Sequence, residues 1–158
     1  MRTVFFGLNG TWEYAMPPIA RWLPFGAGCA GSVGVPRLQA VASARPVVGT
    51  TFPLELVNVP TTGLAAISIG FSASSWSGGP LPGSLASLGM PGCTLFADPQ
   101  FLFTTPIALG RATLSWSLPN DPALAGVQFY DQAIVLDAGV NPLGAVMSNA
   151  GHGVIGTL

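Results

Sequence analysis

The sequence predicts an all-β fold: an antiparallel β-sandwich with Ig-like or Greek-key-like connections, preceded by an extended N-terminal segment. Three observations lead to this prediction. The 21 glycines and 15 prolines fall between short apolar runs, so turn residues recur at strand-length spacing. Hydrophobic residues make up 49% of the chain and charged residues 7%, so a core can form. No long segment shows the 3.6-residue period of an amphipathic helix.

The first 24 residues are predicted to be an extended arm, and residues 25–158 the sandwich domain. Within the arm, short strands are expected at 2–6 and 11–14, joined by a turn at Leu8-Asn9-Gly10, because Asn-Gly is a strong hairpin signal. The arm is rich in aromatic residues, which are candidate contacts to a neighbouring subunit: Phe5, Phe6, Trp12, Tyr14 and Trp22.

From residue 36 onward the expected strands lie at 37–42, 49–60, 64–72, 101–109 and 111–118, with shorter strands within 84–96. In the second of these, Phe52, Leu54 and Leu56 share one face by strict alternation. Pro53 lacks a backbone N–H, which predicts that this strand is at a sheet edge or near its own start. Trp116 alternates with polar residues and is expected in the core.

A single helical turn is predicted at 121–126, with Asp121 as the N-cap and Pro122 in the first helical position. The next segment, 127–136, is apolar on both faces apart from Gln128, Asp131 and Gln132, which favours a strand in the middle of a sheet. The last segment is expected to form two short strands around 148–151.

The charge pattern excludes some classes of function. The basic residues are five arginines without a lysine and the net charge is −1, so no basic patch for nucleic acid is expected. No apolar run reaches the ~18 residues of a membrane span. A surface with so little charge provides weak repulsion between molecules, which favours self-association into an oligomer or polymer.

The two cysteines, Cys29 and Cys93, are too few for a metal site, so no metal and no cofactor are predicted. A disulfide between them is favoured, and two separate buried thiols are the alternative. The glycine pattern at 26–31 matches a dinucleotide-binding motif. Since Pro36 follows too soon for the required helix, we do not assign it that role.

No catalytic group of residues stands out. The only histidine, His152, lies between two glycines in an expected loop, and a hydrolase would have to combine it with Asp131 or Asp137 and a serine. Asp131 is instead expected to pair with an arginine such as Arg111, or to lie at the end of the barrel or sandwich. Trp76, in SSWSGG, is the candidate for stacking on a polysaccharide.

Several motifs follow one another in a recognisable order: FGAGCAGSVGVPRL, LELVNVP, IGFSASSWSGGPLPGSL, LGMPGCTLF and the long segment from LPNDPALAG to AVMSNAG. From about residue 25 onward the chain resembles an uncharacterised β-rich domain, often C-terminal, of predicted secreted proteins from planctomycete-like bacteria. The resemblance implies export and pairing of Cys29 with Cys93, and it implies no enzymatic activity.

Together these observations predict a non-catalytic protein of the cell surface or extracellular space, with a structural or interaction role. Self-assembly through the arm, as the subunit of a filament or surface layer, is the leading hypothesis. A carbohydrate-binding accessory module and a secreted hydrolase are the alternatives.

Overall fold

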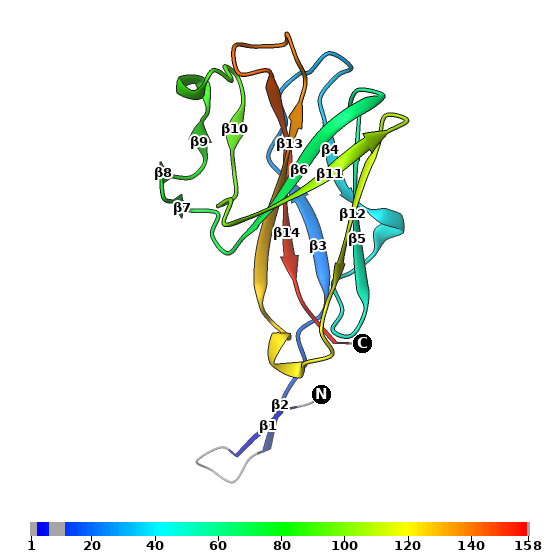
Figure 1. Ribbon diagram of the computed structural model, residues 1–158. Coiled ribbons are helices and arrows are strands. Elements are labelled where there is room, and N and C mark those ends of the chain that lie inside the picture. The colour runs from blue at the N-terminus through cyan, green and yellow to red at the C-terminus, as the bar shows by residue number, and fades with distance from the viewer. Residues whose placement is uncertain (1–2, 7–11, 158) are drawn as a thin grey trace.

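The computed structural model describes residues 3–6 and 12–157, with side chains from residue 16 onward (Figure 1). Its body is a sandwich of two antiparallel sheets, which confirms the predicted fold class. The larger sheet has the order β11 (Phe101–Ala108), β6 (Thr62–Gly70), β13 (Gln128–Leu136), β14 (Ala145–Val154) and β3 (Arg21–Phe25). The smaller has the order β12 (Ala112–Ser117), β5 (Thr51–Val57) and β4 (Arg37–Ala40).

The remaining elements are short. Four strands form small ladders beside the main sheets: β7 (Ser75–Trp76), β8 (Gly79–Pro80), β9 (Gly83–Ser84) and β10 (Thr94–Leu95). Three single-turn 3-10 helices are η1 (Val41–Ser43), η2 (Ala86–Leu88) and η3 (Pro122–Leu124). The last is the predicted helical turn, and the Asp121 carboxylate accepts the Ala123 N–H at 2.9 Å as its N-cap.

The core lies between the two sheets. Phe52, Leu54 and Leu56 are all fully buried on β5, as their alternation predicted. Phe52 packs edge-to-face on Phe129 of β13, with the ring centroids 6.3 Å apart, so the two sheets meet through aromatic side chains. Burial of such side chains supplies most of the driving force for folding.

The connections are Greek-key-like, because strands distant in sequence become neighbours. After β11 the chain crosses to the smaller sheet as β12, and β13 then returns to pair with β6. The central place of β13 in the larger sheet confirms the prediction for 127–136.

Of the two alternatives for Pro53, a place near the start of its strand is confirmed, since β5 begins at Thr51. β5 itself is the central strand of its sheet and not an edge strand. The pairing explains why the proline is tolerated. β4 pairs with residues Leu54 to Val57 only, so Pro53 lies beyond the end of β4 and has a neighbour, Ser115, on one side. Locally, Pro53 is therefore an edge residue.

The C-terminal segment is one long strand, β14, rather than two strands around 148–151. β14 contains a β-bulge at this place. Gln132 pairs with Ala150 and Ile134 pairs with Met147, so the register of β14 against β13 shifts between these two pairs. The bulge directs Asn149 toward the other sheet. Its side-chain amide donates to the Leu38 carbonyl (3.0 Å) and accepts the Leu38 N–H (2.9 Å), which ties β14 to β4.

The segment between β6 and β11, residues 71–100, contains β7 to β10. A disulfide and the side chain of Gln132 hold it against the rest of the domain. Cys29 and Cys93 form the predicted disulfide. On the outer face of β13, buried Gln132 accepts the Phe96 N–H and donates to the Thr94 carbonyl, both at 2.9 Å. Since buried polar groups need partners, the hydrogen bonds of Gln132 determine where segment 71–100 packs on the larger sheet.

The N-terminal strands β1 (Thr3–Phe6) and β2 (Trp12–Ala15) pair with each other in an antiparallel hairpin, as predicted, and the turn residues between them lie outside the described part. The predicted boundary after residue 24 does not match the sheet topology. Residues 21–25 form β3, an edge strand paired with β14. The segment outside the two main sheets is therefore shorter than the predicted arm, and it projects away from the sandwich (Figure 1).

Candidate functional site: the groove between β3 and β4

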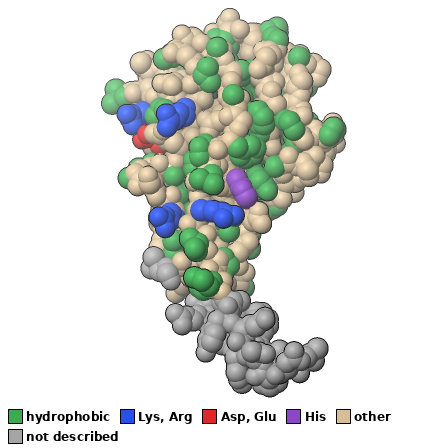
Figure 2. Space-filling model, turned by 180° about the vertical axis from the view of Figure 1, so that it is seen from behind, with side chains coloured by type: hydrophobic (Ala, Val, Ile, Leu, Met, Phe, Trp, Pro, Cys, Tyr) green, Lys and Arg blue, Asp and Glu red, His purple; other side chains and the backbone are tan. Residues whose placement is uncertain are grey.

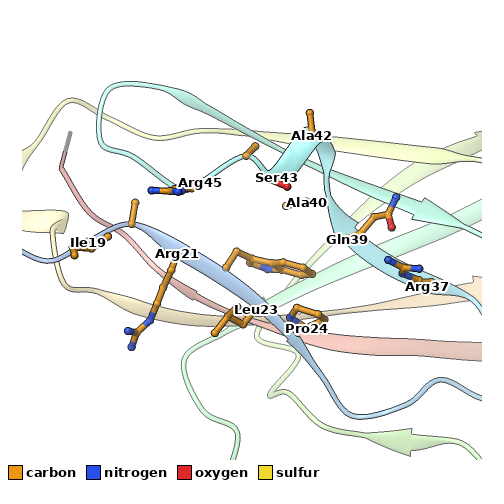
Figure 3. Close-up of a pocket in the computed structure, with 13 residues that line it drawn as sticks. Ile19, Arg21, Leu23, Pro24, Arg37, Gln39, Ala40, Ala42, Ser43 and Arg45 are labelled. Atoms are coloured by element: carbon orange, nitrogen blue, oxygen red, sulfur yellow. The ribbon is translucent and has the colours of Figure 1, made fainter.

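A groove of about 700 Å³ runs along one open side of the sandwich, between the edge strand β3 of the larger sheet and the edge strand β4 of the smaller one (Figure 3). Ile19, Arg21, Leu23 and Pro24 line it from the β3 side. The other wall is formed by β4 and the segment after it, up to residue 45. The groove exists because each sheet ends here without a further strand.

Trp22 lines the groove and is anchored to β13. Its indole N–H lies 3.0 and 3.2 Å from the two carboxylate oxygens of Asp131. Asp131 is fully buried and, within the described residues, has no basic partner. Burial raises the pKa of its carboxyl to about 7, although hydrogen bonds from Trp22 and from the backbone N–H groups of Gly151 and Asp131 oppose this.

The glycines around His152 make room for these side chains. A Cβ atom at Gly151 would lie 2.1 Å from the Trp22 ring and 2.3 Å from an Asp131 oxygen. A Cβ atom at Gly153 would lie 2.1 Å from the Phe129 ring. The Gly-His-Gly sequence is therefore a strand whose inner face is filled by neighbouring aromatic rings.

Three arginines surround the groove. Arg37 and Arg45 come from the β4 side. Arg21 comes from the β3 side, and its side chain points away from the β4 wall, on the face of β3 near His152 (Figure 3). All three are exposed. No carboxylate lines the groove itself, but Glu55, which pairs with Arg111, accepts a hydrogen bond from Gln39 of the β4 wall. Figure 2 shows basic side chains and the histidine on the same face of the molecule. The groove therefore combines an apolar wall with an excess of positive charge, with the Glu55 carboxylate beside its β4 wall.

His152 does not lie in a loop, as the sequence suggested, but within β14. Its ring stacks on Tyr130 with centroids 4.7 Å apart, and Nε2 lies 2.9 Å from the Gln128 side-chain oxygen. Partial burial, and secondarily the positive charge of Arg21, lowers the pKa of the imidazole. At neutral pH this favours the uncharged ring that stacks on the tyrosine.

The residues considered for a hydrolase do not come together. Asp131 faces the interior, while His152 pairs with Tyr130 at the next register position and so faces the opposite side of the sheet. Asp137 accepts the Ser32 N–H and hydroxyl at 2.7 and 3.0 Å, away from both. In the described part of the chain no cluster of three or more His, Cys, Asp or Glu could hold a metal ion.

The suggested pairing of Asp131 with Arg111 is wrong. Arg111 donates to Glu55 at 2.9 Å, and Gln39 donates to the same carboxylate at 2.8 Å. Gln39 and Glu55 lie on the neighbouring strands β4 and β5 of the smaller sheet, and Arg111 directly precedes β12. Asp131 is in the larger sheet and uses Trp22 instead, because a buried carboxylate needs a donor and β3 brings the indole to it.

Trp76 is half-buried and packs against the core. It lines a separate pocket of about 430 Å³ near β8 and β9. The backbone of Gly78 lies against its ring, since a Cβ atom there would approach the ring to 2.2 Å. Part of the indole ring is therefore covered by the backbone of Gly78. The stacking of Trp76 on a polysaccharide stays a prediction.

Two further features concern association. Of the predicted assembly contacts, Phe5, Phe6, Trp12 and Tyr14 lie in the hairpin, where their side chains are outside the described part, whereas Trp22 belongs to the groove.

At the other edge of the larger sheet, β11 has one strand neighbour, β6. Phe101, Leu102 and Phe103 are exposed there, at 53%, 59% and 40%, so this edge is unusually apolar.

A scan against protein-family models finds no match, and searches of curated proteins and of solved structures find none either. None of the helices in the described residues has the length and apolar character needed to cross a membrane. The disulfide is compatible with an exported protein.

Sequence reasoning did not identify the arginines of the groove. Arg21 and Arg37 belong to strands of different sheets, which do not pair with one another, so no spacing rule relates them. A usable signal was the composition: with lysine absent, three arginines between residues 21 and 45 are a large share of the five basic residues.

Proposed function

We propose that this chain is an extracellular structural subunit that assembles with copies of itself through the hairpin β1–β2. The pairing of this hairpin carries the proposal. Val4 lies opposite Tyr14 and Phe6 opposite Trp12, so four apolar residues share one face of the pairing. Neither strand pairs with any other described strand.

Such a hairpin gains little stability by itself. A two-stranded ribbon is at best marginally stable in water unless its apolar face is covered by another surface. The body of the chain offers suitable surfaces at its sheet edges, since β3, β4, β11 and β12 each have one strand neighbour in the main sheets. Strand addition at such edges is a common mode of association, and the low charge of the chain opposes it weakly.

The test is the molar mass of the protein by light scattering, together with electron microscopy. Removal of residues 1–15 should convert an assembly into monomers and leave the thermal unfolding of the sandwich unchanged. The truncation must stop before residue 21, because β3 and Trp22 are part of the sandwich. An assembly that keeps its mass after this truncation would contradict the proposal.

A full-length pair of variants gives a matched control. Phe6→Ser alters the face that carries Trp12 and Tyr14, whereas Phe5→Ser alters the opposite face, which carries Glu13. We expect Phe6→Ser to weaken assembly far more than Phe5→Ser. Equal effects of the two would mean that the apolar face does not mediate the contact.

A further inference from the structure

The groove between β3 and β4 has the character of an acceptor for the hairpin. We propose that the groove of one subunit receives the β1–β2 hairpin of a second copy, with β2 added along β3 and Glu13 of the incoming strand directed toward Arg37 and Arg45 on the β4 wall. This inference rests on the proposed function and adds to it the surface to which the hairpin binds.

The backbone at the groove is suited to an additional strand. β3 pairs with β14 on one side, so alternate N–H and C=O groups on its other side have no strand partner. On the opposite wall, the amide of Asn149 already occupies the N–H and C=O of Leu38. An incoming strand would therefore pair with β3, and β4 would form the facing wall.

The surface of the groove is partly apolar. Ile19 and Leu23 are 66% and 59% exposed at its β3 wall, and alanines line the opposite wall. A volume of about 700 Å³ falls within the range of sites that enclose ligands of several hundred daltons. The groove therefore offers room for the side chains on one face of an added strand.

The charges favour this occupant. The groove has three arginines at its walls and no carboxylate. Four of the six acidic residues have other roles: Glu55 pairs with Arg111, Asp121 caps η3, Asp131 accepts from Trp22, and Asp137 accepts from Ser32. In the hairpin strands the acidic residue is Glu13, which comes between Trp12 and Tyr14 in sequence. Since Glu13 lies on the face of β2 opposite to Trp12 and Tyr14, an added β2 can direct its carboxylate toward the arginines of the β4 wall while its aromatic face covers the exposed Leu23 of β3.

The geometry also determines the kind of assembly. Donor and acceptor are different surfaces of the same chain, so the contact is heterologous and each bound subunit presents a free groove or a free hairpin to the next. The hairpin comes just before β3 in the chain, and β3 forms one wall of the chain's own groove. Successive subunits therefore join head to tail.

The experiment uses two full-length variants that are each defective on one side. Glu13→Arg disables the hairpin, and the triple variant Arg21→Glu, Arg37→Glu, Arg45→Glu disables the groove. Each alone should raise the apparent dissociation constant of assembly by about 100-fold, because like charges would then meet. Ser87→Glu, which adds a negative charge on exposed η2 outside the groove, is the control and should assemble as the wild type does.

Mixing the two variants provides the decisive readout. The hairpin of Glu13→Arg carries positive charge and the groove of the triple variant carries negative charge, so the mixture should recover assembly that neither variant shows alone. Thermal unfolding of each variant verifies that its sandwich is intact.

Two results would overturn the inference while leaving the proposed function standing. If the wild type assembles through its hairpin and the triple variant assembles equally well, the acceptor is another surface, and the apolar edge of β11 is the next to mutate. If the triple variant assembles normally but loses retention on a polyuronate gel, the groove binds acidic polysaccharide instead. Loss of the Phe6→Ser effect, by contrast, would contradict the proposed function itself.

Discussion

The buried carboxyl of Asp131 should make the stability of the sandwich depend on pH in an unusual direction. Its pKa is about 7 in the folded protein, against an ordinary value of 3.8. Between these values the unfolded chain has released the proton and the folded chain still holds it. Stability therefore falls as the pH rises from about 4 to about 7, and then levels off.

The size of the effect follows from the separation of the two pKa values. About three pH units at about 1.4 kcal/mol each correspond to roughly 4 kcal/mol lost between acid and mildly alkaline solution. Asp131→Asn removes the titration and keeps the shape of the side chain. Like the protonated acid, the amide still offers one oxygen to the Trp22 indole N–H.

The assay is urea unfolding of the wild type and Asp131→Asn across the range from about pH 4 to about pH 8.5. The difference between the two free energies of unfolding isolates Asp131. His152 also titrates. Because its pKa is lowered in the folded protein, stability decreases as the pH falls below the pKa of this histidine in the unfolded chain. Both proteins contain His152, so its contribution cancels in the difference. Between about pH 4 and about pH 8.5, the free energy of unfolding of Asp131→Asn should rise by about 4 kcal/mol relative to that of the wild type.

A difference that stays constant over this range would refute the reasoning, because it would mean that the folded and unfolded carboxyl groups titrate alike. A second variant tests the cause. Trp22→Phe removes a hydrogen bond that favours the charged carboxylate, so the pH at which stability levels off should move upward.

Three further predictions concern packing and cross-links. Gly153→Ala places a methyl group against the phenyl ring beneath it and should lower stability by about 2 kcal/mol, measured by urea unfolding. Asn149→Ala leaves the N–H and C=O of Leu38 without partners and should cost about 3 kcal/mol; an unchanged midpoint would mean that water replaces the amide. Replacing Cys29 and Cys93 by serine opens a loop with a sequence separation of 64 and should cost about 4 kcal/mol, seen as a fall of about 10 °C in Tm.

Local signals in the sequence determined the fold class and much of the strand pattern. The alternation of Phe52, Leu54 and Leu56 identified the buried face of β5, and Asp121-Pro122 identified the single helical turn. These predictions succeeded because each depends on residues within a few positions of one another, where the period of a strand or the geometry of a cap is visible. Where a longer-range partner decides the outcome, the sequence was less informative. For Pro53 it left two alternatives open, and around Asn149 its prediction of two strands was wrong.

The groove was decided by tertiary structure alone. Arg21 and Arg37 come to the two walls of one groove because two sheets end side by side, and Trp22 meets Asp131 across 109 positions of sequence. Composition could show that charges are few and that Asp131 had no local role. Which donor would satisfy it, and where the arginines would gather, depends on the order of strands in the two sheets, and no periodicity in a single segment records that order.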